Sequence, residues 1–217
     1  MVTFFQVRGR ARLSARRAWI ALALLSGLAA ASSRAAEPVY IGLDEAYSIS
    51  TSTTPKAIER GVRAAMEEIN ARGGVLGGRP LRLLTTDNQG VSARGRDNFV
   101  DLAGKPGLVA VFSGKFSPIT VETTPEASRL QVPLVSVWGS ADPITDGPAG
   151  QVPPYVFRVS LKDSWGVEAM MKRARSHHRA TRLCALLPNT AWGRSGDKVL
   201  TTRSQAACVQ MVSTRWY

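Results

Sequence analysis

Cysteine is scarce in this 217-residue sequence, which holds only Cys184 and Cys208, so at most one disulfide can form within the chain. The G-x-S-x-G nucleophile elbow, the H-E-x-x-H zinc motif and the phosphate-binding P-loop are all absent. No apolar run reaches the roughly 20 residues that a membrane-spanning helix needs. These absences argue against an enzyme, although catalytic partners can lie far apart in a sequence.

No acidic residue occurs in the first 35 positions, which hold six of the 28 basic residues. The basic residues flank a short apolar run, "AWIALALLSGLAAA", at Ala18–Ala31. A positive leader, a short apolar core and small residues at its exit are typical of a secretory signal peptide. We therefore predict that residues 1–35 are a signal peptide, cleaved after Ala31, Ala35 or Ala36. The mature protein is expected to be periplasmic, with no membrane span.

The formal charge of +12 looks like a signal for nucleic-acid binding until its position is considered. Without the leader, 22 of the 28 basic residues remain against 16 acidic ones, which is an ordinary surface charge. We expect no nucleic-acid partner.

A cluster of four glycines in "EINARGGVLGGRP" raises the question of a bound nucleotide. A dinucleotide-binding glycine motif follows a strand and opens a helix, so that phosphate meets the helix N-terminus. This cluster instead follows a predicted helix and precedes a predicted strand. Gly73 or Gly74 is expected to end the helix, and Gly77-Gly78 to turn the chain into the strand. No cofactor is implied.

Short apolar segments alternate with amphipathic segments along the chain after the leader. Strands are predicted at 39–43, 81–86, 108–112, 133–137, 156–160, 183–187 and 209–216. Helices are predicted at 55–72, with Thr54 as N-cap, and at 93–103, 118–130, 165–175 and 194–206. This alternation predicts an α/β fold with a doubly wound parallel sheet. Ligands bind at the carboxyl ends of such strands, here the loops 44–54, 113–117 and 138–142.

Several segments carry a family resemblance. "IERGVRAAMEEINARGGVLGGRPLRLLTTDNQG" resembles the first helix, glycine turn and second strand of type I periplasmic binding proteins. "LVAVFSGKFSPIT" and "PLVSVWGSADPIT" are similar to loops of the branched-chain amino-acid, or leucine-binding, branch that serves ABC transporters. "YVFRVSLKD" and "LLPNTAWGRSG" resemble the crossing into the second lobe and the first loop of that lobe.

The resemblance implies two α/β lobes that close on a small ligand. The first lobe would span residues 38–157, and residues 158–217 would form the crossover and an incomplete second lobe. The sequence would then be a fragment, the product of a broken reading frame or an incomplete gene model. Because the acidic partner for a ligand ammonium would lie in the missing part, this chain is not expected to bind tightly.

The function implied by the resemblance is that of an exported substrate-binding protein of an ABC importer. Its partners would be an amino acid or similar small solute and, for the full-length protein, permease subunits. A ligand sensor of the same fold and an exported flavodoxin-like enzyme are the alternatives. The ligand itself cannot be inferred, because amino acids, amides, urea and aromatic acids all use this scaffold.

The resemblance also supplies ligand-binding candidates. Ser117 matches a hydroxyl that binds the ligand carboxylate, and it precedes a helix start whose free N–H groups favour anions. It could equally be only a helix cap. The other candidates are Phe116 next to it, Trp138, Gly139 and Ser140 in the following loop, Trp192 as an aromatic cover, and Tyr47 and Ser48 in the first loop.

Two further pairs of residues raise the questions of a disulfide and of a metal site. Cys184 and Cys208 would lie near the amino ends of neighbouring parallel strands, where a structural disulfide is geometrically possible and free buried thiols are equally expected. His177 and His178 are adjacent, so they do not share a helix face, and we expect no metal site there.

Overall fold

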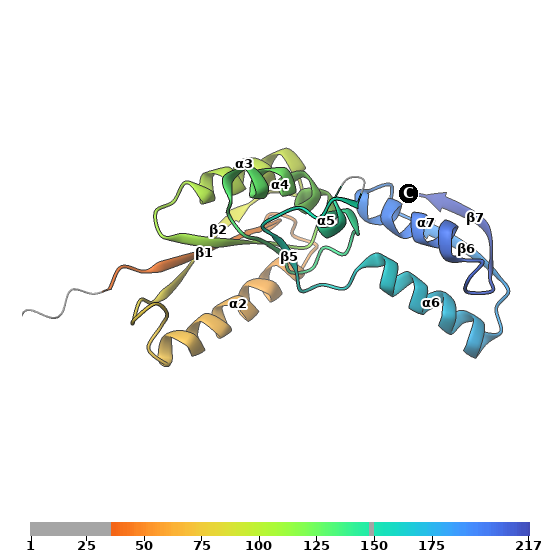
Figure 1. Ribbon diagram of the computed structural model, residues 1–217, viewed down its shortest axis with the longest axis horizontal. Coiled ribbons are helices and arrows are strands. Elements are labelled where there is room, and N and C mark those ends of the chain that lie inside the picture. Colours follow the sequence, from red (N-terminus) through yellow and green to blue (C-terminus); the bar gives the residue numbers. More distant parts are fainter. Residues whose placement is uncertain (1–35, 148–149) are drawn as a thin grey trace, which may run out of the picture. The chain divides into compact units, whose positions relative to one another are not determined.

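A computed structural model describes residues 36–147 and 150–217 (Figure 1). The predicted signal peptide, residues 1–35, lies outside the described residues.

Parallel strands form the framework. The first sheet has five strands in the order β2-β1-β3-β4-β5, and a second sheet pairs β6 with β7; every pairing is parallel. The strands are β1 (Val39–Glu45), β2 (Leu81–Asp87), β3 (Leu108–Ser113), β4 (Leu134–Ser136), β5 (Val156–Arg158), β6 (Arg182–Leu187) and β7 (Gln210–Trp216). The predicted α/β fold with a parallel sheet is therefore confirmed.

Helices connect the strands. They are α2 (Thr54–Ala71), α3 (Ser92–Ala103), α4 (Ser117–Leu130), the short α5 (Pro143–Asp146), α6 (Asp163–His178) and α7 (Ala191–Arg203). Helix α2 lies on one face of the five-stranded sheet, and α3 and α4 lie side by side on the other (Figure 1). Among the described residues no helix combines the length and apolar character needed to cross a membrane.

Two apolar cores hold these elements. The larger includes Phe99 and Leu102 of α3, packed with Val111 of β3, Leu134 of β4 and Ile144 of α5. Burying a side chain of this size contributes about 1.5–3 kcal/mol. A second core joins α6 and α7 to the β6–β7 sheet and contains Met171, Val199, Ala207 and Val209.

The glycine cluster is a turn, as the sequence predicts. Helix α2 ends at Ala71, and its C-cap is Arg72. The four glycines that follow have φ values of 102°, 76°, 80° and 103°, in the left-handed region that favours glycine. The side-chain amide of Asn70 then pairs with the backbone of Leu81, accepting from its N–H at 2.7 Å and donating to its carbonyl at 2.9 Å. This pair fixes where β2 begins.

Several predicted boundaries differ from the structure. Strand β1 continues through Asp44 and Glu45, which the sequence reading assigned to a loop. Helix α7 begins at Ala191 rather than residue 194, because the Thr190 hydroxyl accepts a hydrogen bond from Gly193 N–H and caps it earlier. At the start of α2, the N-cap is Thr53 rather than Thr54, and no side chain caps it.

The carboxylate of Asp44 ties the end of β1 to its neighbours. It accepts hydrogen bonds from Thr86 Oγ1 at 2.9 Å, Asn88 Nδ2 at 2.8 Å and Asn98 Nδ2 at 2.7 Å. Burial raises the pKa of Asp44, and these three donors oppose the rise. A single buried carboxyl group thus joins β1, the end of β2 and α3 at the edge of the sheet where ligands are expected.

Candidate ligand-binding site

The loops after β3 and β4 meet at Ser117, which is only 3% exposed. Ser117 Oγ accepts hydrogen bonds from the backbone N–H groups of Ser140, at 3.2 Å, and Ala141, at 3.3 Å. The sequence expectation that Ser117 caps its own helix is wrong, because Ser117 is the first residue of α4 and the N-cap, Phe116, makes no side-chain cap. The hydroxyl instead holds together two loops that were predicted to carry the site.

Gly139 supports the same loop from inside. Its carbonyl accepts hydrogen bonds from Ser136 Oγ at 3.0 Å and Ser160 Oγ at 2.6 Å. A side chain at this position would meet Ile144 and Ser136 at 3.2 Å. The Gly139 carbonyl is thus engaged within the protein, and Gly139 fixes the shape of the loop.

A cavity of about 340 Å³ opens beside these loops. It is lined by Lys115, Phe116, Ser117, Pro118, Trp138, Ser140, Pro188, Thr190, Trp192 and Tyr217. Five of the eight predicted site residues are therefore brought together in one cavity wall. The walls come from the ends of β3 and β4 on one side and from the β6–α7 connection and the end of β7 on the other.

Trp138 and Trp192 are the largest rings of the cavity. Trp138 is 56% exposed and Trp192 is 49% exposed. Gly193, next to Trp192, has no room for a side chain, because a Cβ there would overlap the carbonyl oxygen of Pro188. Close approach of these two backbones therefore sets the position from which Trp192 projects.

Five lining residues were missed by sequence reasoning: Lys115, Pro118, Pro188, Thr190 and Tyr217. Lys115 had a signal, since it stands in the 113–117 loop that follows a predicted strand. Its Nζ donates to Ser52 Oγ at 3.1 Å and lies 5.3 Å from the centre of the Phe116 ring. Tyr217 had none, because its approach to the cavity depends on how β7 pairs with β6.

Tyr47 and Ser48 are not among the residues that line this cavity, so this part of the prediction is corrected. Tyr47 lies beside Glu59 of α2, and its pKa is raised by burial and by that carboxylate. Ser48 is exposed and lies beside Asp87 at the end of β2. Because β1 continues to Glu45, the first loop begins later than expected and turns these residues towards α2 and β2.

Glu45 lies under the β3–α4 loop and is 1% exposed. Its Oε2 accepts a hydrogen bond of 3.4 Å from the backbone N–H of Lys115, and its Oε1 is buried without a partner. Burial raises the pKa of Glu45 to about 7, and Asp44 adds to the rise, while the N–H groups of Lys115 and Ala46 oppose it. The charge of Glu45 therefore changes near neutral pH at the root of the loop that carries Lys115.

A second cavity of about 260 Å³ shares Ser140, Pro188 and Trp192 with the first. Asp163 lines it, is 7% exposed, and has one carboxylate oxygen, Oδ2, without a hydrogen-bond partner. Burial raises the pKa of Asp163 and Asp142 adds to the rise, while the nearby side chains of Ser140, Ser195 and Trp192 oppose it.

Backbone contacts join the loop after β4 to the later part of the chain. Asp142 N–H donates to Ser195 Oγ at 2.9 Å, and Asp163 N–H donates to the Ser140 carbonyl at 2.9 Å. The Arg158 guanidinium donates to the carbonyls of Ser140, at 3.2 Å, and Ala141, at 2.8 Å. The backbone of Ser140 is therefore held at its N–H by Ser117 and at its carbonyl by Arg158 and Asp163.

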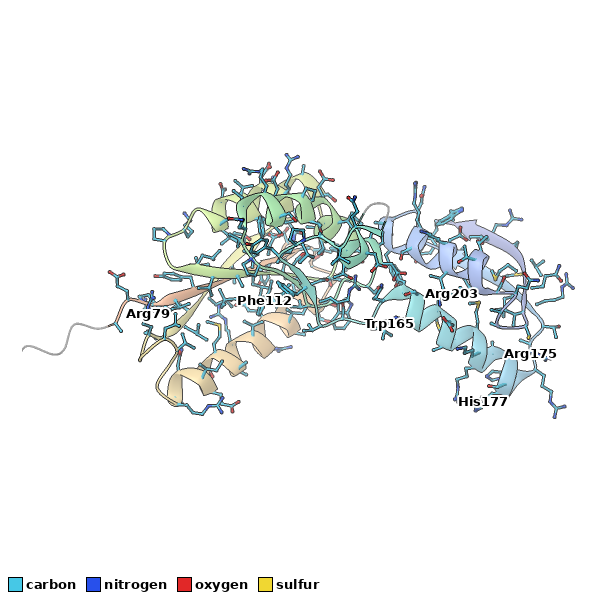
Figure 2. The ribbon with its side chains drawn as sticks, viewed as in Figure 1. Arg79, Phe112, Trp165, Arg175, His177 and Arg203 are labelled. Atoms are coloured by element: carbon cyan, nitrogen blue, oxygen red, sulfur yellow. The ribbon has the colours of Figure 1, made fainter. Side chains whose placement is uncertain are left out.

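The remaining candidates lie elsewhere. Cys184 and Cys208 are free, exposed thiols, so neither a disulfide nor a buried thiol is present in the structure. In the paired strands Cys184 stands opposite Ser213, and Cys208 precedes β7. His177 and His178 end α6, where His177 and the nearby Arg175 extend from the ribbon (Figure 2).

Comparison with protein families identifies the chain. A family model described as "Periplasmic binding protein" matches residues 38–217. The chain belongs to the periplasmic binding protein family. Its members and the solved neighbours are substrate-binding proteins of ABC transporters, which agrees with the branch that the sequence motifs resemble. No curated protein matched the chain.

Solved structures show the same fold. The substrate-binding protein LivJ from Streptococcus pneumoniae, solved in complex with isoleucine, superposes with a TM-score of 0.70 at 21% identity, over 83% of this chain and 50% of that one. A type 1 periplasmic binding protein from Bordetella pertussis gives 0.73 at 20% identity, over 83% and 49%. A solute-binding protein from Rhodopseudomonas palustris, in complex with 3,4-dihydroxybenzoic acid, gives 0.68 at 16% identity, over 82% and 47%. The chain thus spans about half the length of these relatives.

Proposed function

We propose that this chain is the ligand-binding part of an exported substrate-binding protein of an ABC importer, and that it binds an amino acid or a related small acid. Residues 38–157 would form its first lobe, and residues 158–217 the crossover and the beginning of the second. The family to which the chain belongs supports the role of a binding protein.

The 340 Å³ cavity is the observation that carries the proposal. Its walls include Phe116, Ser117 and Trp138 from the first sheet's loops, and Thr190 and Trp192 from the start of α7. A pocket of this size, mostly apolar with a few polar groups, is typical of small-molecule sites. Closing the α7 side over a solute held by the first side would be the physical basis of capture.

Relatives with this fold are solved with two kinds of solute, isoleucine and 3,4-dihydroxybenzoic acid. Both carry a carboxylate. A cavity that binds either needs hydrogen-bond donors for that group and an apolar wall for the rest of the solute, and the lining residues of this cavity offer both.

Saturation-transfer NMR tests the proposal, because it detects weak binding. The mature chain would be screened with L-leucine, L-isoleucine, benzoate and 3,4-dihydroxybenzoate, and at least one should bind with a dissociation constant of about 1 mM or lower. Trp192→Ala should abolish the signal, whereas Trp165→Ala should keep it. Trp165 lies at the start of α6 (Figure 2), is 59% exposed and does not line the cavity. No signal from the panel, or equal signals from the two variants, would contradict the proposal.

A further inference from the structure

We infer that the solute class of the 340 Å³ cavity is a planar aromatic carboxylate rather than an α-amino acid. This inference rests on the proposed function and names the ligand chemistry of the same cavity. It follows from the charge, the hydrogen-bond donors and the rings of the lining residues.

The first step concerns charge. Lys115 has the one charged side chain in the cavity wall, and it is half-buried. In the described ranges, 36–147 and 150–217, no carboxylate lies close enough to its ammonium to form an ion pair, and the partner of its Nζ is Ser52 Oγ. An ammonium has three N–H donors, so two remain for a ligand. The charge of Glu45 acts on Lys115 from beneath the loop, but without an ion-pair contact. A half-buried cation without such a contact favours an anion beside it.

The second step concerns Ser117. A hydroxyl has two acceptor lone pairs and one donor hydrogen. Both lone pairs of Ser117 Oγ are used by the N–H groups of Ser140 and Ala141. The hydrogen that remains can only donate, and donation to a carboxylate gives a charge-assisted bond. Ser117 and Lys115 therefore present donors in the same wall, which is the complement of a carboxylate.

The third step concerns the rings. The wall contains four aromatic side chains, Phe116, Trp138, Trp192 and Tyr217. Both indoles keep about half of their surface exposed, so a ligand would bury apolar area that the protein leaves uncovered. Aromatic side chains favour stacked or edge-to-face contact with another ring, so a planar ring gains more here than an aliphatic chain of equal size.

The fourth step concerns the ammonium of an amino acid. None of the residues lining this cavity has an acidic side chain, and the Gly139 carbonyl already accepts two hydroxyl groups. Asp163 lines the neighbouring cavity instead, close to the side chains of Ser140, Ser195 and Trp192. An ammonium in the 340 Å³ cavity would thus face Lys115 without a compensating side-chain carboxylate in its wall.

Four solutes of similar size separate these contributions. Benzoate has both the aromatic ring and the carboxylate. Cyclohexanecarboxylate keeps the carboxylate without an aromatic ring, and benzamide keeps the ring without the charge. L-Leucine has a carboxylate and an ammonium but no aromatic ring. Titration of the mature chain, followed by saturation-transfer NMR, should give benzoate a dissociation constant about fivefold or more below that of each other solute.

Lysine variants supply the matched control. Lys115→Met should weaken benzoate binding about tenfold and leave benzamide binding unchanged, because only the carboxylate uses the ammonium. Lys115→Arg should restore most of the loss. Lys105→Met, an exposed lysine that does not line the cavity, should change neither.

The outcomes distinguish the inference from the function on which it rests. Preference for L-leucine over benzoate, or equal benzoate affinity in Lys115→Met and Lys105→Met, would overturn the aromatic-carboxylate inference and leave a solute-binding cavity. Binding of none of the four solutes would overturn the aromatic-carboxylate inference, and a further absence of binding by L-isoleucine and 3,4-dihydroxybenzoate would overturn the proposed function as well.

Discussion

The backbone of Gly114 lies directly against the carboxylate of Glu45, so closely that any side chain at position 114 would overlap it. A larger residue at the point where β3 leaves the sheet would therefore have to displace this carboxylate or the loop. The buried carboxylate packs against the loop that carries Lys115, Phe116 and Ser117. A substitution of either should therefore shift the cavity residues on this loop.

Gly114→Ala should destabilise the protein by about 2 kcal/mol, because the added methyl group displaces either Glu45 or the loop. Gly61→Ala is the matched control. It lies in the middle of α2 with no atom within 4 Å of the added methyl, and it should stabilise the helix by about 0.5–1 kcal/mol. Urea denaturation measures both variants. Equal effects of the two substitutions would contradict the close packing of Gly114 against Glu45.

Glu45 should make stability fall as the pH rises towards neutrality. The pKa of Glu45 is raised from an ordinary value of 4.5 to about 7, so between these values the folded protein holds a proton that the unfolded chain has lost. The contribution is complete below about pH 4.5 and is lost as the pH rises through about 7.

Glu45→Gln removes this titration. Between pH 4.5 and 8 the wild type should lose about 3 kcal/mol more free energy of unfolding than the variant, as measured by urea denaturation at each pH. Parallel pH profiles for the two proteins would show that Glu45 does not titrate as the structure implies.

Asp44→Ala should cost about 3 kcal/mol, because Thr86, Asn88 and Asn98 all lose the acceptor of their hydrogen bonds. Asp101→Ala, an exposed carboxylate of α3, should stay within about 0.5 kcal/mol of the wild type. Thermal unfolding compares them. A loss at Asp44 no larger than at Asp101 would show that the network is not a stabilising one.

Ser117→Ala should free the loop after β4. The N–H groups of Ser140 and Ala141 lose their acceptor, so their hydrogen exchange should quicken at least about tenfold, with a loss of about 1–2 kcal/mol in global stability. Ser50→Ala, at an exposed loop position, should change neither. Unchanged exchange at residues 140 and 141 would rule out the role given to the hydroxyl.

The fold could be predicted because its signals are local. The alternation of apolar strands with amphipathic helices, and the glycines that need left-handed backbone after α2, depend on neighbours in sequence. Phe116, Ser117, Trp138, Ser140 and Trp192 could be proposed for the site because their segments resemble loops of the periplasmic binding protein family. For the loops 113–117 and 138–142, the position at the carboxyl ends of parallel strands pointed the same way.

The rest could not be predicted, because it depends on long-range burial. Asp44 and Glu45 look like loop residues, yet they are strand residues, since partners on α3 and in the β3–α4 loop come from positions far along the chain. That extension moves Tyr47 and Ser48 away from the cavity. The position of Lys115 in the cavity wall also depends on a long-range contact, because its loop packs on Glu45.

Fluorine NMR of the mature chain labelled with 5-fluorotryptophan tests the central claim most directly, because it reports on each indole separately. Phenylalanine variants would assign the resonances, and the chain would then be titrated with benzoate and with L-leucine. The account predicts that the solute that binds shifts the resonances of Trp138 and Trp192 and leaves that of Trp165 in place. Binding that moves Trp165 alone, or that leaves Trp138 and Trp192 unchanged, would contradict it.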